Sequence, residues 1–219
     1  MPDTFFDPHQ RATIEAAMAR IIPTDDAPGA REAGCIDFLD RYLSGVGYIF
    51  AKPDGSGFEV LEGRSAKAWM QRIEIMRARY VEGIEDLDAR GRRHFSADFV
   101  ALTPAQQDDV LRAVEASGTG QPTTLTPNDA LAGPVSAEPA LQQTSTEVDL
   151  KFLPLLITHT RQGFYADPIY GGNRDQTGWK VIGFPGPASM KEVHAGRYTT
   201  LQYFAEGEAE KVKEFHDGL

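Results

Sequence analysis

Residues 66–90 read AKAWMQRIEIMRARYVEGIEDLDAR and contain the longest periodic pattern of the sequence. Large apolar side chains recur there in steps of three and four residues, at Trp69, Ile73, Met76, Tyr80, Ile84 and Leu87. Residues three and four positions apart share one face of a helix, so this spacing predicts an amphipathic helix. We therefore expect a long central helix over 66–90, against which the other elements pack.

Two further motifs predict the starts of helices. Residues 7–10 read DPHQ and residues 103–106 read TPAQ, so each has a capping side chain, then a proline, then a glutamine three residues after the cap. Such a cap and glutamine bond reciprocally to backbone N–H groups, and proline suits the first helical position. Apolar residues at helical spacing follow both motifs, and Pro23 ends the first run. We expect helices over 8–22 and from residue 104 onward.

Two more helices are expected from the same spacing. One covers 30–43 and stops at Gly45, and the other covers 152–164 with Pro154 near its start. Between the helix over 30–43 and the long helix over 66–90, residues 45–63 are interrupted by glycine and proline. They predict a loop with a short hairpin through 57–61.

The fold class follows from these elements. Residues 117–139 are rich in glycine, proline, serine and threonine, which predicts an exposed connection. We expect a mainly α protein, a single domain over 1–219 with five or six helices, long irregular loops and little or no sheet.

Composition narrows the classes of function. The formal net charge of -10, without a cluster of lysine and arginine, argues against a nucleic-acid partner. Cys35 is the only cysteine, which excludes an internal disulfide and a Cys-x-x-Cys zinc or haem motif. The densest apolar run, 152–157, is far shorter than the ~20 residues that span a bilayer. No secretory signal is visible at the start, so the chain as written is expected to be soluble and cytoplasmic.

Residues 164–179 read FYADPIYGGNRDQTGW and concentrate aromatic rings, glycines and charged groups after an apolar helix. Glycines permit close backbone approach, and polar side chains can tie an irregular loop to its own backbone. Tyr170 and Trp179 are rigid rings of the kind enriched at interface centres. The segment therefore predicts either a loop bonded onto its own domain or a surface that binds another protein. A phosphate-binding loop is disfavoured, because the flanking strand and the lysine are missing.

His159 and Asp167 are the residues that an independent small enzyme would use. A catalytic base needs an orienting partner and a nucleophile within hydrogen-bond reach, and a histidine that closes an apolar stripe is more often structural. The remaining histidines are scattered without metal-ligand spacing. We therefore expect no catalytic, cofactor-binding or metal-binding residue in this chain.

Several motifs resemble the gluconate 2-dehydrogenase subunit 3 family. The N-terminal match comprises FFDP at 5–8, RIIPTDDAPGA at 20–30 and EAG at 32–34, and LTPAQQ at 102–107 also fits. The most specific match is THT at 158–160, GFY at 163–165, DPIYGGNRD at 167–175 and GW at 178–179. Residues 118–137 look longer than expected for the family, and the tail after 187 matches nothing in it.

This resemblance implies a non-catalytic small subunit that binds and stabilises a large FAD-dependent sugar, polyol or sugar-acid dehydrogenase subunit, or aids its maturation or export. The implied partner is of the glucose-methanol-choline type, carries FAD and the catalytic histidine, and is often joined by a cytochrome c. Many members begin with a twin-arginine export signal, so a periplasmic location is the alternative if a signal was removed or the partner carries it. A transient flavoprotein chaperone is a further alternative, motivated by 117–139. The residues we expect at the partner interface are His159, Tyr165, Asp167, Tyr170, Asn173, Arg174 and Trp179.

Overall fold

Helices form nearly all the regular structure of the described part of the chain, which in this computed structural model comprises residues 4–117, 147–184, 186–187, 191–192 and 195. The main helices are α1 (Pro8–Ile21), α2 (Cys35–Ser44), α3 (Gly63–Phe95), α4 (Pro104–Ser117), α6 (Phe152–Tyr165) and α7 (Thr177–Val181). Short 3₁₀ turns are η1 (Val46–Tyr48), η2 (Phe99–Ala101), η3 (Pro168–Tyr170) and η4 (Arg174–Gln176). Within these residues the only β pairing is an isolated antiparallel bridge, Ala51 with Phe58. The expectation of a mainly α protein is confirmed.

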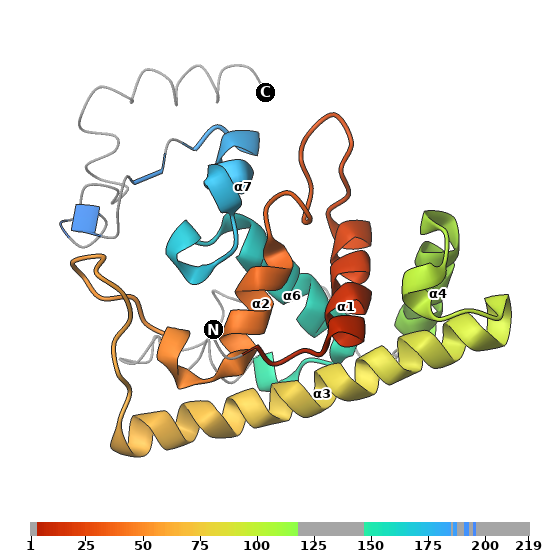
Figure 1. Cartoon of the computed structure of the whole chain (residues 1–219), viewed down its shortest axis with the longest axis horizontal. Helices are drawn as coiled ribbons and strands as arrows, with labels where there is room; N and C mark the ends of the chain where they lie inside the picture. Colours follow the sequence, from red (N-terminus) through yellow and green to blue (C-terminus); the bar gives the residue numbers. More distant parts are fainter. Residues whose placement is uncertain (1–3, 118–146, 185, 188–190, 193–194, 196–219) are drawn as a thin grey trace, which may run out of the picture.

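The central helix α3 has 33 residues and is longer than the sequence predicted. At 1.5 Å per residue it extends about 50 Å, and Figure 1 shows it along one edge of the molecule with the other helices on one side. Its buried face includes Ile73, Met76, Tyr80 and Leu87, in the predicted periodic positions. The periodic pattern therefore identified the face that packs against the core.

Both predicted capping motifs form. The Asp7 carboxylate accepts a bond from the backbone N–H of Gln10, and the Gln10 side chain accepts one from the backbone N–H of Asp7. At the start of α4, Thr103 and Gln106 make the same exchange, with donor–acceptor distances of 3.0 and 3.4 Å. These local bonds fix where α1 and α4 begin, which is why short motifs predicted them.

Two predicted boundaries shift. The helix expected over 30–43 begins only at Cys35, because Gly34 adopts a left-handed conformation (φ +67°) that interrupts any helix through it. The hairpin expected through 57–61 is displaced, since its bridge joins Ala51 and Phe58. Pro154 lies in the first turn of α6, where it breaks no helical hydrogen bond, as expected.

The core lies where α2 and α6 cross and where α1 and α3 cover them. Leu39 and Leu43 of α2 and Leu155 and Leu156 of α6 have no exposed surface. The two helices approach closely because α6 has Gly163 at the crossing, where a Cβ would lie 3.1 Å from the Cα of Cys35. This crossing supports the end of α6, from which the signature segment 164–179 continues.

The connection predicted over 117–139 lies outside the described residues, except for Ser117 at the end of α4. Most of the tail after 187 also lies outside them. None of the described helices combines the length and the apolar character needed to cross a bilayer.

Candidate functional site

The signature segment 164–179 folds back onto the end of α6 and is tied there by Asn173. The Asn173 backbone N–H donates to the carbonyl of Gly163 at 2.7 Å, and its side-chain amide donates to the carbonyl of Ala166 at 2.9 Å. Its side-chain oxygen accepts a bond from the backbone N–H of Gly178 at 2.8 Å. Since Asn173 has no exposed surface, these bonds replace the water that its amide loses on burial.

Backbone strain is concentrated in the same segment. Asn173, Asp175 and Gln176 have φ values of +47°, +56° and +59°, a region that residues with a Cβ seldom adopt. Close approach requires glycine at two nearby positions: a Cβ on Gly172 would lie 2.2 Å from the carbonyl oxygen of Gly163, and one on Gly178 would lie 1.9 Å from that of Phe164. Strain of this kind persists only where the surrounding structure enforces it.

Three of the seven residues expected at a partner interface are sealed inside the chain. His159 and Asn173 have no exposed surface, and Trp179 is 6% exposed, with its ring N–H donating to the carbonyl of Tyr165 at 2.8 Å. Asn173 and Trp179 hold the segment against the end of α6, whereas His159 is enclosed between α6 and Tyr80 of α3. In this fold the three side chains offer little or no surface to a partner, contrary to the expectation of direct contact.

The other four expected interface residues keep exposed surface. Tyr165 is 41% exposed, Arg174 is exposed, and Asp167 and Tyr170 are half-buried. Asp167 accepts a bond from the backbone N–H of Ile169 and so starts η3. Their contact with a partner stays a prediction.

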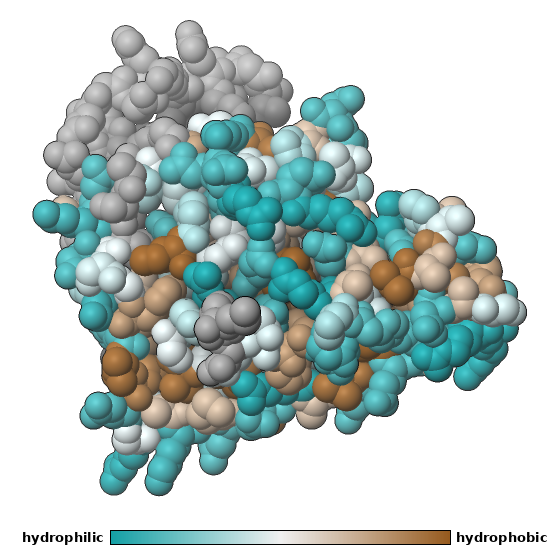
Figure 2. Space-filling model, viewed as in Figure 1, coloured by the Kyte–Doolittle hydropathy of each residue, from teal (hydrophilic) through white to brown (hydrophobic). Residues whose placement is uncertain are grey.

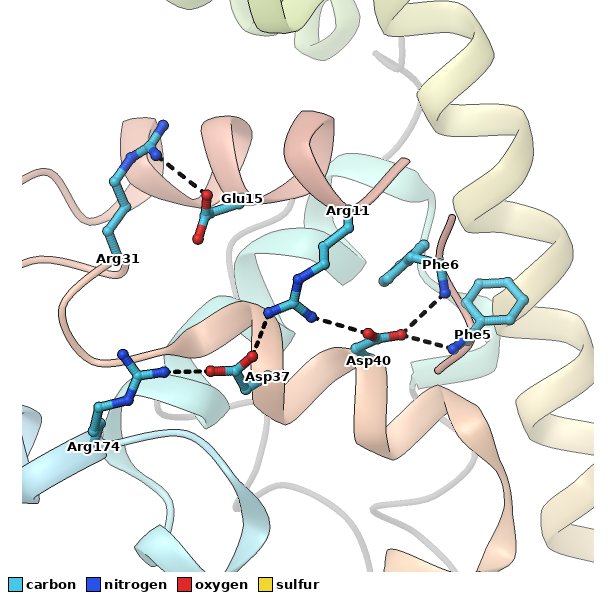
Figure 3. A network of polar contacts seen from close by, with 8 residues as sticks. All are labelled: Phe5, Phe6, Arg11, Glu15, Arg31, Asp37, Asp40 and Arg174. Carbon is cyan, nitrogen blue, oxygen red and sulfur yellow. Dashed lines mark hydrogen bonds and ion pairs between the residues drawn. The ribbon is translucent and has the colours of Figure 1, made fainter. Parts of the chain in front are cut away.

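A network of charged side chains joins the segment to the N-terminal half of the protein (Figure 3). Arg174 pairs with Asp37 of α2, and Arg11 of α1 bridges Asp37 and Asp40. The Asp40 carboxylate is buried and also accepts bonds from the backbone N–H groups of Phe5 and Phe6, at 2.8 and 3.0 Å. The network therefore joins the N-terminal arm, α1 and α2 to η4, which is distant from them in the sequence.

An open groove of about 420 Å³ lies where α2, the loop 46–58 and the end of α6 meet. Its lining includes Phe38, Tyr42, Tyr48, Gln162, Tyr165 and Tyr170. Tyr170 fixes one wall, because its hydroxyl accepts a bond from the backbone N–H of Ala51 and its ring meets that of Phe58 edge-on. We call this feature the aromatic groove.

Glu147 bonds two side chains that line the aromatic groove. Its carboxylate accepts a bond from the Tyr42 hydroxyl at 3.2 Å and another from the side-chain amide of Gln162 at 2.7 Å. Burial, followed by the nearby charge of Glu147, raises the pKa of Tyr42, so this phenol stays protonated and donates. The two bonds to Glu147 hold these lining side chains in fixed orientations.

His159 and Asp167 do not form a catalytic pair in the structure. His159 is fully buried, and its Nδ1 shares a 2.8 Å hydrogen bond with the Tyr80 hydroxyl. Burial lowers the pKa of His159 to about 4, so the ring is neutral at physiological pH. Asp167 is instead occupied with the backbone of η3, and the aromatic groove is not lined by His159. The geometry therefore counts against the independent enzyme that these two residues would have served.

Neither the single cysteine nor the acidic and histidine side chains of the described residues support a nucleophilic or metal-binding site. Burial raises the pKa of the Cys35 thiol to about 12, so it is not a thiolate nucleophile. Among the residues that the structure describes, no group of three or more His, Cys, Asp or Glu side chains is arranged to hold a metal ion.

Sequence reasoning missed most of the aromatic groove. Sequence patterns assigned no role in a site to the lining residues Phe38, Tyr42, Tyr48 and Gln162. These side chains come from three segments, and only the folded chain brings them together. The one available signal was the pair Tyr165 and Tyr170 within the aromatic, glycine-rich segment 164–179.

The fold and site together define a mainly α protein whose strained, glycine-rich segment is bonded onto its own core beside an open aromatic surface. The family model for gluconate 2-dehydrogenase subunit 3 matches residues 8–186, which is most of the chain. The chain belongs to this family. Comparison with curated proteins and with solved structures gave no match.

Proposed function

We propose that this protein is the non-catalytic small subunit of a large FAD-dependent dehydrogenase that oxidises a sugar, a polyol or a sugar acid. Membership of the gluconate 2-dehydrogenase subunit 3 family is the observation that supports the proposal, since the family name denotes one subunit of a dehydrogenase that has several subunits. The flavin and the catalytic residues belong to the large subunit, of the glucose-methanol-choline type. A cytochrome c is a third component of the proposed complex.

The aromatic groove is the surface that we propose for the large subunit. Tyrosine is enriched at interface centres because it combines a large apolar area with a hydroxyl and few rotatable bonds. Tyr165 is 41% exposed beside three other tyrosines of the groove, Tyr42, Tyr48 and Tyr170. The Tyr170 hydroxyl accepts a bond from the Ala51 N–H and the Tyr42 hydroxyl donates one to Glu147, so these rings are held before any partner arrives, which limits the entropy lost on binding.

Affinity purification of the tagged chain from its native cells tests this function. We expect a larger protein to co-purify in a fixed ratio, with a bound flavin visible by its absorbance and with sugar or polyol dehydrogenase activity. A chain recovered alone, without a flavoprotein, would contradict the proposal. A fixed ratio in the active dehydrogenase would also exclude the transient chaperone that 117–139 suggested.

A further inference from the structure

We propose that the aromatic groove receives an acidic segment of the partner polypeptide, in which an apolar side chain enters among the tyrosines and a neighbouring carboxylate pairs with Arg41. This inference rests on the proposed function and adds the chemistry of the partner's contacting segment. The charges around the aromatic groove carry it.

Most arginines of the described chain are already neutralised. Carboxylates lie within 4 Å of the guanidinium groups of Arg11, Arg20, Arg31, Arg77, Arg90, Arg92, Arg112 and Arg174. This pairing is expected in a chain whose formal net charge is -10. Six other described arginines have no carboxylate within 4 Å among the described residues: Arg41, Arg64, Arg72, Arg79, Arg93 and Arg161.

Arg41 is one of these exceptions, and it borders the aromatic groove. Its guanidinium lies 5.3 Å from the ring centre of Tyr48, and it donates to the carbonyl of Ile169 at 3.0 Å. No ion pair of Arg41 is found among residues 4–117 and 147–184. Arginine has five N–H groups in a planar fork that matches a carboxylate, so Arg41 keeps donors for an anionic partner.

Arg161 adds a second positive charge on the same side. It is exposed, it precedes the groove residue Tyr165 by four positions on α6, and residues at that spacing share one helix face. Within the described residues, Arg161 likewise forms no ion pair. An aromatic surface beside two such arginines fits an acidic segment that carries an apolar side chain.

Two carboxylates also lie near the aromatic groove, and both are engaged within the chain. Glu147 accepts bonds from Tyr42 and Gln162, and Asp167 accepts one from the backbone N–H of Ile169. Neither is within 4 Å of Arg41 or Arg161. The carboxylate oxygens of Glu147 and Asp167 are thus already used as acceptors within the chain, whereas Arg41 and Arg161 form no ion pair among the described residues and can pair with an incoming carboxylate.

Three short peptides titrated against the purified full-length chain test the proposal. The first is the acetylated, amidated sequence Gly-Glu-Phe-Glu-Gly, the second has glutamine for both glutamates, and the third has alanine for phenylalanine. NMR of ring-labelled tyrosine reports occupancy of the groove. We expect the first peptide to shift the signals of Tyr48, Tyr165 and Tyr170, and the other two to bind at least about fivefold more weakly, since each lacks one part of the contact.

Variants separate a specific contact from general attraction. Arg41→Gln should weaken binding of the first peptide by about fivefold. Arg161→Gln, which removes no described contact, should weaken this binding by about twofold. Arg93→Gln is the matched control, because Arg93 is also exposed, has no ion pair among the described residues and belongs to the far end of α3. Thermal melting of each variant verifies its fold.

Five outcomes would overturn the inference. Equal binding of the glutamine peptide would mean that the occupant is merely apolar, and an equal loss in Arg93→Gln would mean non-specific attraction. Tyrosine shifts caused by raising the protein concentration alone would identify a second copy as the occupant. Much tighter peptide binding after deletion of 196–219 would identify the chain's own acidic C-terminal residues. A failed titration beside a successful co-purification would reject this inference and leave the proposed function standing.

Discussion

The role of a buried polar residue depends on the whole fold, and His159 shows why one sequence could not assign that role. The sequence allowed either a structural histidine or a catalytic base at this position. In the fold, its ring is sealed between α3 and α6, with Nδ1 against the Tyr80 hydroxyl at 2.8 Å. Burial depends on residues about 80 positions away, so no local pattern could reveal it.

The pH dependence of stability should report this buried ring. The pKa of His159 is lowered by burial to about 4, below its ordinary value of 6.5. The unfolded chain therefore binds a proton at higher pH than the folded chain, so the stability is complete above pH 6.5 and declines as pH falls towards 4. Between pH 7 and pH 4, we expect His159 to remove about 3 kcal/mol from the free energy of unfolding.

Urea unfolding of the wild type and of His159→Gln at a series of pH values measures this contribution. The variant keeps a polar group beside Tyr80 and cannot titrate, so its stability should decline less steeply below pH 6.5. Because the carboxylates titrate in both proteins, the difference between the two curves of stability against pH is the informative quantity. Parallel curves would show that His159 is not buried as described.

Among the helices, the sequence succeeded wherever a local signal defined a boundary. The starts of α1 and α4 follow from reciprocal bonds within four residues, and the long periodic run fixed the inner face of α3. The start of α2 was misplaced, because the left-handed conformation of Gly34 cannot be recognised from composition. The sequence also left undecided whether 164–179 packs on α6, because that packing depends on close backbone contacts at glycines that exist only in the folded chain.

Trp179 tests that packing. Its ring is 6% exposed and its N–H bonds the carbonyl of Tyr165, so Trp179→Ala should detach α7 and the preceding loop from α6. Removing a buried tryptophan costs about 3 kcal/mol or more. Hydrogen exchange should become much faster over 168–184 and stay slow in α1.

The matched control is Trp179→Phe, which keeps a buried ring and loses only the N–H bond, at a cost of about 1 kcal/mol. Its exchange over 168–184 should lie between those of the wild type and the alanine variant. Slow exchange in Trp179→Ala would show that the ring does not hold the segment, and would restore Trp179 as a candidate for direct partner contact.

At the scale of the whole molecule, hydrophilic residues cover most of the face seen in Figure 2, and hydrophobic residues gather in separate areas. The aromatic groove is the described feature that combines open volume with exposed tyrosine and unpaired arginine. It unites α2, the loop 46–58 and α6, so its position follows from the tertiary fold. The sequence could indicate that Tyr165 and Tyr170 matter, but not which residues surround them.

The central claim is that a flavoprotein binds at the aromatic groove, and co-purification with two matched variants tests it most directly. Tyr165→Asp places a charge on a groove residue that is 41% exposed. Val100→Asp is the control, because Val100 is 38% exposed and belongs to η2, which packs with α1, α3 and α4. We expect Tyr165→Asp to reduce the recovered flavoprotein by at least about tenfold, as for an interface hot spot, and Val100→Asp to leave recovery unchanged. Full recovery with Tyr165→Asp, in a chain that melts like the wild type, would contradict the account.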